Sequence, residues 1–371
     1  MGDPMKKEKS IKSAVKAKIM IKYCLCVTAV FSVAATVLIF PMQSADGVRE
    51  GLSLCIKSVI PSLFPFMVIS SFLVQSNILS GIDRVFSKIT YFVFRQPACS
   101  GSIIFLSLIG GFPVGASLVK QLYENKKITQ SEGQRLLLFC INPGPAFVIS
   151  CVGVQMLSSQ KIGIILFLSV TVSALILGFL TRFMTDVEER TAATEKKQAF
   201  HFSDSLVSAA SKSTNSILLI CGWVILFSTL SALVKTAGFH ESTVLFLDCL
   251  LEVTNGCYKA SSVLPVSVIA GIIGWSGLCV HCQVMPSIVK LRLNYKYFIT
   301  GRIICGALSC VLCSALLQIF KIDVPAIKLN CESVSAQKPE FLPVSLGLLI
   351  LCAFILVGDG LKIRIKTKSR Y

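Results

Sequence analysis

Helix-breaking residues interrupt strongly apolar sequence in three stretches of this chain, at 107–117, 142–145 and 270–281. Proline cannot donate a backbone hydrogen bond, and glycine permits non-helical dihedral angles. Each stretch therefore predicts one helix that ends and a second that begins, with free N–H groups and a positive dipole end at the new start. The residues concerned are Gly110, Gly111, Pro113, Gly115, Asn142, Gly144, Pro145, Ser276 and Gly277.

Half-helices are expected to begin at Val114, Pro145 and Leu278. Three such N-termini near the middle of a membrane would form an anion site without any buried basic residue. For a single break, a kink or a close helix contact is the favoured interpretation, because Gly and Pro are common in transmembrane helices. Breaks in corresponding regions of two halves favour a transport site instead.

Ionisable groups inside apolar segments are costly and usually functional, and this chain has few: Asp248, Glu252 and His281. Glu252 is the candidate for proton or ion coupling, with a place at the membrane interface as the alternative. His281, with Gln283 two residues on, either titrates near neutrality or bonds a carbonyl freed by the break. Asn142, Asn255 and His281 are expected to orient a bound anion.

Neither a metal centre nor another cofactor is expected. Cys279, His281 and Cys282 have a suggestive spacing, but zinc needs four ligands and no second pair is available. The sequence also lacks a Gly-x-Ser-x-Gly elbow, a His-Glu-x-x-His helix and a Walker loop, so we do not expect an enzyme. Most of the sixteen cysteines sit singly in apolar runs, where cysteine behaves as a small hydrophobic residue.

The composition places these residues in a membrane. The 371 residues are 54% hydrophobic and 15% charged, with a mean hydropathy of +0.75, which is too apolar for a soluble protein. We predict an all-α, polytopic transmembrane helical bundle with roughly eight crossings plus broken or re-entrant helices, in two loosely repeated halves. The predicted spans are 20–40, 63–74, 103–119, 136–156, 162–183, 217–234, 245–254, 263–280, 298–319 and 342–357.

The chain divides into five regions by composition. They are a basic tail and first anchor (1–45), a first membrane repeat (46–184), a polar connecting loop (185–205), a second membrane repeat (206–320), and an outside loop with the last span and a basic tail (321–371). The net charge of +17 is concentrated in the two tails. Basic flanks stay cytoplasmic, so both termini are expected inside, near anionic lipid and not on nucleic acid. The side of the membrane from which the second broken segment enters stays open. Counting positive charges places its entry on the cytoplasmic side, whereas an inverted repeat would place it on the opposite side.

Several motifs resemble the YlbJ family of sporulation integral membrane proteins. In the first half they are GGFPVGASL (110–118) and ITQSEGQRLLLFCINPGPAFV (128–148). In the second half they are LEVTNG (251–256), GWSGLCVHCQ (274–283) and the pair Gly301-Arg302. The residues that match the family pattern are Gly111, Pro113, Gly115, Asn142, Gly144, Pro145, Glu252, Asn255, Gly256, Gly277, His281 and Gln283.

The resemblance implies a nucleoside recognition, or gate, domain related to concentrative nucleoside transporters. It also implies a role in endospore-forming bacteria, moving dipicolinic acid from the mother cell toward the forespore across a mother-cell-derived membrane. The leading hypothesis is thus a permease for a small anionic metabolite. The alternatives are a nucleoside-type transporter and a membrane scaffold for spore-envelope assembly. A homo-oligomer or a partner membrane protein is compatible with each.

Overall fold

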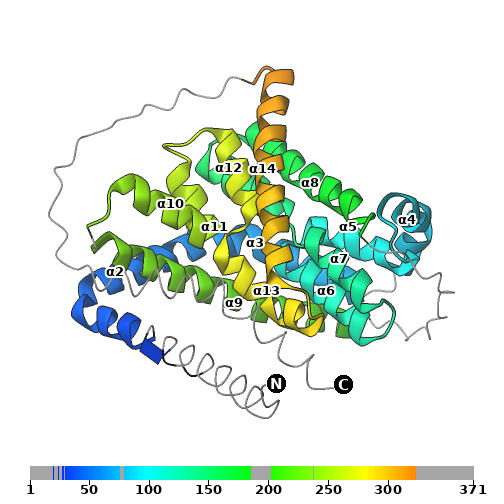
Figure 1. Ribbon diagram of the computed structural model, residues 1–371, viewed down its shortest axis with the longest axis horizontal. Coiled ribbons are helices and arrows are strands. Elements are labelled where there is room, and N and C mark those ends of the chain that lie inside the picture. Colours follow the sequence, from blue (N-terminus) through cyan, green and yellow to red (C-terminus); the bar gives the residue numbers. More distant parts are fainter. Residues whose placement is uncertain are drawn as a thin grey trace, which may run out of the picture. The chain divides into compact units, whose positions relative to one another are not determined.

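The computed structural model describes residues 30–75, 79–184, 202–236 and 238–322, together with Met20, Cys24, Val27 and Thr28. Within these ranges the chain is helical and contains no β-strand (Figure 1), which confirms the all-α prediction. The predicted last span, both basic tails and most of the connecting loop lie outside the described residues.

Two compact units make up the chain. One consists of Met1–Gly47, Thr229–His240 and Val334–Tyr371, and the other of Val48–Ser228 and Glu241–Ser333. The second unit contains every candidate site residue. Its helices and those that border it are α2 (Pro41–Leu54), η1 (Cys55–Val59), α3 (Ile60–Gln75), α4 (Leu79–Phe94), η2 (Ala98–Ser100), α5 (Gly101–Gly110), α6 (Phe112–Glu124), α7 (Gln130–Phe139), η3 (Ala146–Met156), α8 (Gln160–Thr181), α9 (Phe202–Thr236), α10 (Glu241–Leu251), α11 (Val253–Ala260), α12 (Val266–Trp275), α13 (Gly277–Lys290) and α14 (Tyr295–Ile319).

Five described helices are long and apolar enough to cross a membrane: Pro41–Leu73, Gln160–Thr181, Ser203–Thr236, Val266–Lys290 and Tyr295–Ile319. The pair Val85–Phe94 and Ala98–Gly110 adds a sixth if it counts as one span, although it bends by 99°. The spans predicted at 162–183, 217–234 and 298–319 are confirmed as apolar helices. Those at 103–119, 136–156 and 263–280 contain the breaks that the sequence predicts within them, and the one at 245–254 is interrupted at Glu252, where no break was predicted.

Local sequence explains where several helices begin. At α7 the hydroxyl of Thr129 accepts from the Glu132 N–H at 3.2 Å, and the Glu132 carboxylate accepts from the Thr129 N–H at 2.6 Å. This reciprocal pair satisfies two backbone donors that a helix start leaves free. Ser159 and Asn294 cap α8 and α14 in the same manner with one side-chain bond each. The turns at 125–129, 157–159 and 291–294 can thus be short.

Apolar packing joins the helices of both halves. α8, α12 and α14 pack against one another, and α6 packs against α13 (Figure 1). Fully buried side chains from α7, α8, α12 and α14 meet in one core, among them Leu136, Leu166, Ile269 and Phe298.

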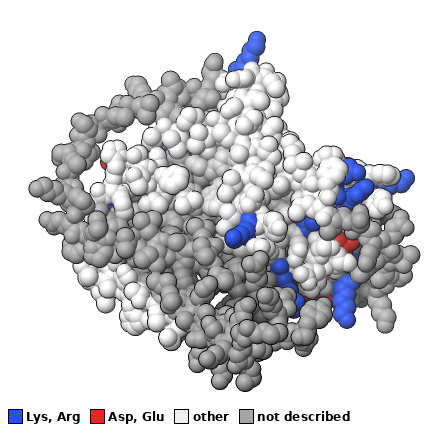
Figure 2. Space-filling view, viewed as in Figure 1, with Lys and Arg blue, Asp and Glu red and all other residues white. Residues whose placement is uncertain are grey.

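The outer surface is apolar as well. On α14, Ile303, Val311 and Ile319 are each more than half exposed. Figure 2 shows wide areas of the described surface on one face without a Lys, Arg, Asp or Glu side chain. An exposed apolar face on a helix of this length is typical of contact with lipid.

Candidate functional site

The first break separates α5 from α6 at Gly111. Its φ of 83° and ψ of 177° stop α5, and α6 begins at the next residue, Phe112, with Pro113 in its first turn. The start therefore lies two residues before the predicted Val114. A proline fits the first turn because the N–H that it lacks has no intrahelical acceptor there.

The second break follows α7. Residues 141–144 are non-helical, and the π-helix η3 begins at Ala146 directly after Pro145. Asn142 does not cap this second helix. Its Nδ2 atom donates to the Phe139 carbonyl at 2.6 Å and so closes the end of α7.

The first two breaks touch each other at Gly144. A Cβ atom added there would lie 2.7 Å from the Ile109 carbonyl oxygen and 3.2 Å from the Gly111 nitrogen. These separations are shorter than van der Waals contact allows, so this approach of two backbones requires a residue without a side chain. Glycine at 144 is thus explained by a neighbouring break and not by its own turn alone.

The third break separates α12 from α13. Ser276 and Gly277 both adopt left-handed backbone angles, with φ of 75° and 72°. α13 begins at Gly277, one residue before the predicted Leu278. Left-handed angles are strained for residues that carry a Cβ atom, so the glycine is suited to its position.

A fourth break, which the sequence analysis did not predict, lies at Glu252 between α10 and α11. Glu252 has extended angles (φ −140°, ψ 123°), and its carboxylate accepts from the backbone N–H groups of Thr254 at 2.9 Å and Asn255 at 2.6 Å. A Cβ atom added to Gly277 would lie 2.9 Å from the Val253 nitrogen. The third and fourth breaks therefore touch, as the first and second do.

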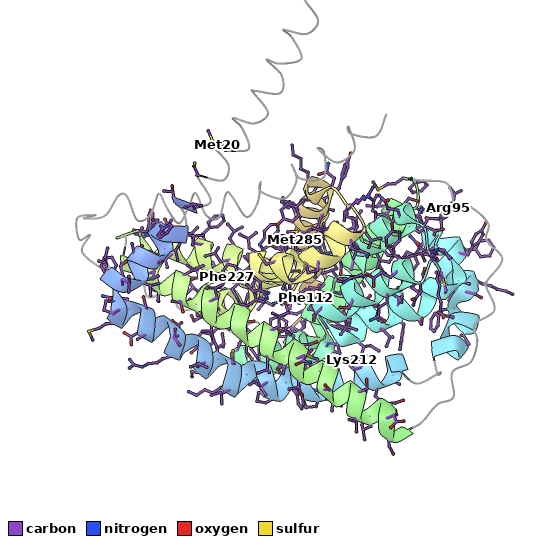
Figure 3. All side chains as sticks on the ribbon, turned by 90° about the horizontal axis from the view of Figure 1, so that it is seen from below. Met20, Arg95, Phe112, Lys212, Phe227 and Met285 are labelled. Atoms are coloured by element: carbon purple, nitrogen blue, oxygen red, sulfur yellow. The ribbon has the colours of Figure 1, made fainter. Side chains whose placement is uncertain are left out.

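The helices that begin after the four breaks meet at one cavity. It has a volume of about 40 Å³ and is lined by residues in the first turns of α6, η3, α11 and α13. The opposite wall consists of apolar side chains from α3 and α9: Leu63, Met67, Ile220 and Val224. Figure 3 shows Phe112, the first residue of α6, inside the helix assembly, and its ring centroid lies 6.5 Å from that of Phe147 on η3.

The structure divides the predicted site residues into two groups. Those that line the cavity are Gly110, Gly111, Pro113, Gly144, Glu252 and Gln283. The others lie behind its wall: Val114, Gly115, Asn142, Pro145, Asn255, Ser276, Gly277 and His281. The second group shapes the breaks, whereas the first is in a position to meet a ligand.

Arg302 is a buried basic residue between two of the breaks, although no Lys or Arg lines the cavity itself. Its side chain lies on α14 and is 1% exposed. It donates to the carbonyl oxygens of Ile141 at 2.6 Å and Leu138 at 3.2 Å, and to the Ser276 hydroxyl at 3.4 Å. Arg302 therefore satisfies the carbonyl end of α7 and links the second break to the third. It does not line the cavity.

Arg302 could have been found from the sequence. It stands near the start of the apolar run 298–319, and an ionisable residue inside a span is a default candidate for a special role.

His281 bonds a carbonyl group freed by the break, which is one of the two roles that the sequence allowed. Its Nε2 atom lies 3.2 Å from the carbonyl oxygen of Trp275, the last residue of α12, and its Nδ1 atom lies 3.4 Å from the Tyr295 hydroxyl. Both ring nitrogens therefore have partners. Among the described residues, no three His, Cys, Asp or Glu side chains gather in a metal-binding arrangement.

Two further side chains cover the carbonyl ends of broken or bent helices. Trp275 Nε1 donates to the Leu250 carbonyl at 3.0 Å, near the end of α10. Arg135 on α7 donates to the carbonyls of Phe94, at 3.0 Å, and of Arg95, at the end of α4. With Arg302 and His281 they form a set of four, and each side chain comes from an element other than the helix that it closes.

Charge at the cavity comes from one residue. Among the residues that line it, Glu252 alone is ionisable at neutral pH. The positive partial charges come from the helix starts, because the first N–H groups of a helix have no intrahelical acceptors. The site thus combines several N-terminal helix ends with one internal carboxyl group.

Comparison with known proteins points to a sporulation family. The Bacillus subtilis (strain 168) protein named "Sporulation integral membrane protein YlbJ" is 25% identical to this chain over an alignment of 319 positions, which covers 75% of this chain and 78% of that protein. The similarity confirms the resemblance to the YlbJ family. The chain is a sporulation-associated, multi-pass integral membrane protein. No protein-family model matches it, and no solved structure does.

The close approach at Gly144 leads to a first prediction. Gly144→Ala should lower the free energy of unfolding by about 1–3 kcal/mol, because the added methyl group forces two backbones apart. Thermal unfolding of the purified protein in detergent measures the effect. Gly222→Ala on α9 is the matched control, since nothing lies within 4 Å of a Cβ atom added there. Equal melting temperatures for the two variants would contradict the close approach.

The bonds of Arg302 lead to a second prediction. Arg302→Lys keeps the charge but cannot reach both carbonyls and the hydroxyl, so it should cost about 1–3 kcal/mol for each acceptor left without a donor. The exposed Arg292 in the turn before α14 provides the control Arg292→Lys, which should leave the melting temperature unchanged. An Arg302→Lys protein as stable as the control would show that these bonds contribute nothing to stability.

Proposed function

We propose that this protein is a permease that carries a small dicarboxylate across a membrane during sporulation. The observation that supports it best is the convergence of four helix breaks, two from each half, on a single cavity. Broken backbone is tolerated at membrane depth where it lines a cavity or is covered by protein. Paired interruptions in two halves of a chain are typical of transporters.

The chemistry of the cavity wall favours an anion. The starts of α6, η3 and α13 present N–H groups and positive dipole ends, a recurring way to bind carboxylate or phosphate. Two carboxylates on a planar ring could engage two helix starts at once. Dipicolinate, the substrate that the family resemblance implies, has this form.

The size of the cavity requires a conformational change during transport. One water needs roughly 10–15 Å³ of such space, so the observed volume of about 40 Å³ holds only a few waters. A dicarboxylate therefore enters only when the walls separate. The structure represents a closed state in this proposal.

In this proposal, protonation of Glu252 couples proton movement to substrate transport. An ionised carboxylate at the cavity wall repels an incoming dianion, whereas a protonated one does not. A proton on Glu252 would thus accompany the substrate. Release of that proton would restore the charge and favour release of the substrate.

Uptake by reconstituted protein tests the function directly. Purified protein in liposomes should accumulate radiolabelled dipicolinate with saturable kinetics, and excess unlabelled dipicolinate should suppress the signal. Uridine is the competitor that represents the nucleoside alternative. Absence of saturable dipicolinate flux with monodisperse, folded protein would refute the proposal. Uptake that uridine suppresses and unlabelled dipicolinate does not would indicate a nucleoside-type transporter instead.

A third prediction concerns Glu252. Wild-type uptake should rise as the external pH falls, because protonation removes the repelling charge. Glu252→Gln resembles the protonated form, so it should still exchange labelled for unlabelled dipicolinate while its uptake no longer depends on pH. Glu241→Gln, at an exposed acid near the start of α10, is the control and should behave like the wild type. A pH profile unaltered by Glu252→Gln would exclude Glu252 as the coupling group.

A further inference from the structure

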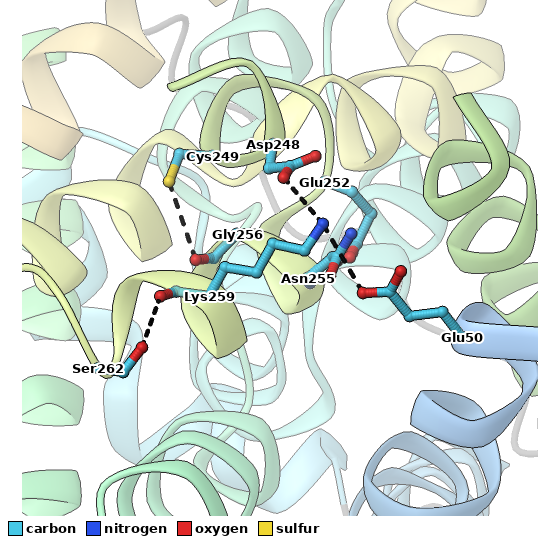
Figure 4. A network of polar contacts seen from close by, with 8 residues as sticks. All are labelled: Glu50, Asp248, Cys249, Glu252, Asn255, Gly256, Lys259 and Ser262. Carbon is cyan, nitrogen blue, oxygen red and sulfur yellow. Dashed lines mark hydrogen bonds and ion pairs between the residues drawn. The ribbon is translucent and has the colours of Figure 1, made fainter. Parts of the chain in front are cut away.

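A second polar group lies directly behind Glu252 and does not line the cavity. The ammonium of Lys259 on α11 lies 2.8 Å from Asp248 Oδ2 on α10 and 3.7 Å from Glu50 Oε1 on α2. Figure 4 shows the ammonium between these two carboxyl groups, with Asn255 and Glu252 beside them. Three elements thus contribute to one line of ionisable side chains.

Exposure increases along this line. Glu252 is 2% exposed as a residue. The Asp248 side chain is 1% exposed, that of Lys259 is 17% exposed and that of Glu50 is 36% exposed. The line therefore leads from the cavity wall, through a buried ion pair, to a partly exposed acid.

Two buried oxygen atoms in this group have no hydrogen-bond partner: Asp248 Oδ1 and Asn255 Oδ1. Both residues are at most 2% exposed. A buried acceptor without a donor is costly, so such atoms indicate a donor that is bound at least part of the time. Because the Lys259 ammonium already occupies the position that a sodium ion would need, a proton or a proton-carrying water fits the site better than a metal cation.

We propose that Asp248, Lys259 and Glu50 form the route by which protons reach and leave Glu252. This inference rests on the proposed permease function and adds the proton path to it. Asp248 and Glu252 are four residues apart, and the Glu252 N–H donates to the Asp248 carbonyl at 3.0 Å. The two side chains thus start from adjacent backbone, and a bridging water would carry the proton between them in this proposal.

The transfer conserves charge at each step. The O–H bond of protonated Glu252 breaks, and its proton forms an O–H bond at Asp248 Oδ1. Asp248 is then neutral, and the Lys259 ammonium shifts its pairing to the Glu50 carboxylate. The proton leaves Asp248 for water on the Glu50 side, after which Lys259 pairs with Asp248 again.

Other titratable groups face Glu252 from the surrounding elements. They are the thiols of Cys55, Cys151, Cys257 and Cys279 and the Asp248 carboxyl. Free thiols have an ordinary pKa of about 8.5. The thiols thus stay protonated in the range where carboxyl groups titrate, which leaves Asp248 as the proton acceptor next to Glu252.

The experiment separates proton-driven uptake from exchange. The full chain in liposomes is assayed for uptake of labelled dipicolinate driven by a pH gradient and for exchange without a gradient. Asp248→Asn and Glu50→Gln should lower gradient-driven uptake, for Asp248→Asn by about a hundredfold, the loss typical when a positioned proton carrier is removed. Exchange should stay near the wild-type rate, because these residues do not line the cavity. Glu241→Gln should leave both rates unchanged.

A double variant covers the case in which Asp248→Asn does not fold. Asp248→Asn with Lys259→Met removes both charges of the ion pair together, so no unpaired charge is left buried. It should show the same loss of gradient-driven uptake with exchange retained. Gradient-driven uptake at the wild-type rate in this variant would overturn the route.

The outcomes for the wild type distinguish the two proposals. Saturable exchange without any response to a pH gradient, or uptake driven by sodium in its place, would overturn the proton route and leave the permease function standing. Absence of both exchange and uptake would overturn the two proposals together. Gradient-driven uptake lost in Asp248→Asn and kept in Glu241→Gln would support both.

Discussion

The structure depends on the satisfaction of backbone carbonyl groups at the ends of interrupted helices. Helices that stop inside an apolar bundle leave up to four carbonyl oxygens each without intrahelical donors, and no bulk water is present to replace them. Here side chains from other elements reach the carbonyl ends of four helices. Arg135 serves α4, Arg302 serves α7, Trp275 serves α10, and His281 serves α12.

This arrangement makes the two kinds of helix end unequal. The carbonyl ends of α4, α7, α10 and α12 are covered by side chains from other elements, whereas the starts of α6, η3, α11 and α13 open onto the cavity, together with the end of α5 at Gly110. Only α11 has a negative side chain of its own at that point, the carboxylate of Glu252. The polarity of the cavity therefore follows from how the core closes the opposite ends, and not from a basic residue in its wall.

Three of the four helix breaks could be predicted from the sequence because they contain Gly or Pro, and the fourth could not because it contains neither. Three of the breaks are indicated by Gly or Pro, which disfavour continuous helix; these residues are Gly111, Pro113, Gly144 and Gly277. The break at Glu252 has no such marker, because Leu-Leu-Glu-Val-Thr contains neither residue. There, burial and two N–H bonds to the carboxylate outweigh the helical preference of glutamate.

Which breaks lie against each other could not be predicted from sequence patterns either. The contact between Gly144 and Ile109 joins the second break to the end of α5, and Arg302 reaches Leu138 across 164 positions of sequence. Such contacts depend on tertiary packing, which local propensity does not encode. The helices without breaks, α8 and α14, were predictable because their apolar runs are long and their starts carry Ser159 and Asn294.

Arg302 joins segments that are distant in the sequence. Its guanidinium donates to the carbonyls of Leu138 on α7 and of Ile141 just after it, and to the Ser276 hydroxyl in the α12–α13 turn, so these segments are held together behind the cavity. The facing wall from α3 and α9 meets the cavity through aliphatic side chains, whose contacts have no directional preference and re-form easily after displacement. In the proposed permease, a movement that admits a solute should therefore displace this aliphatic wall more readily than the segments that Arg302 holds together.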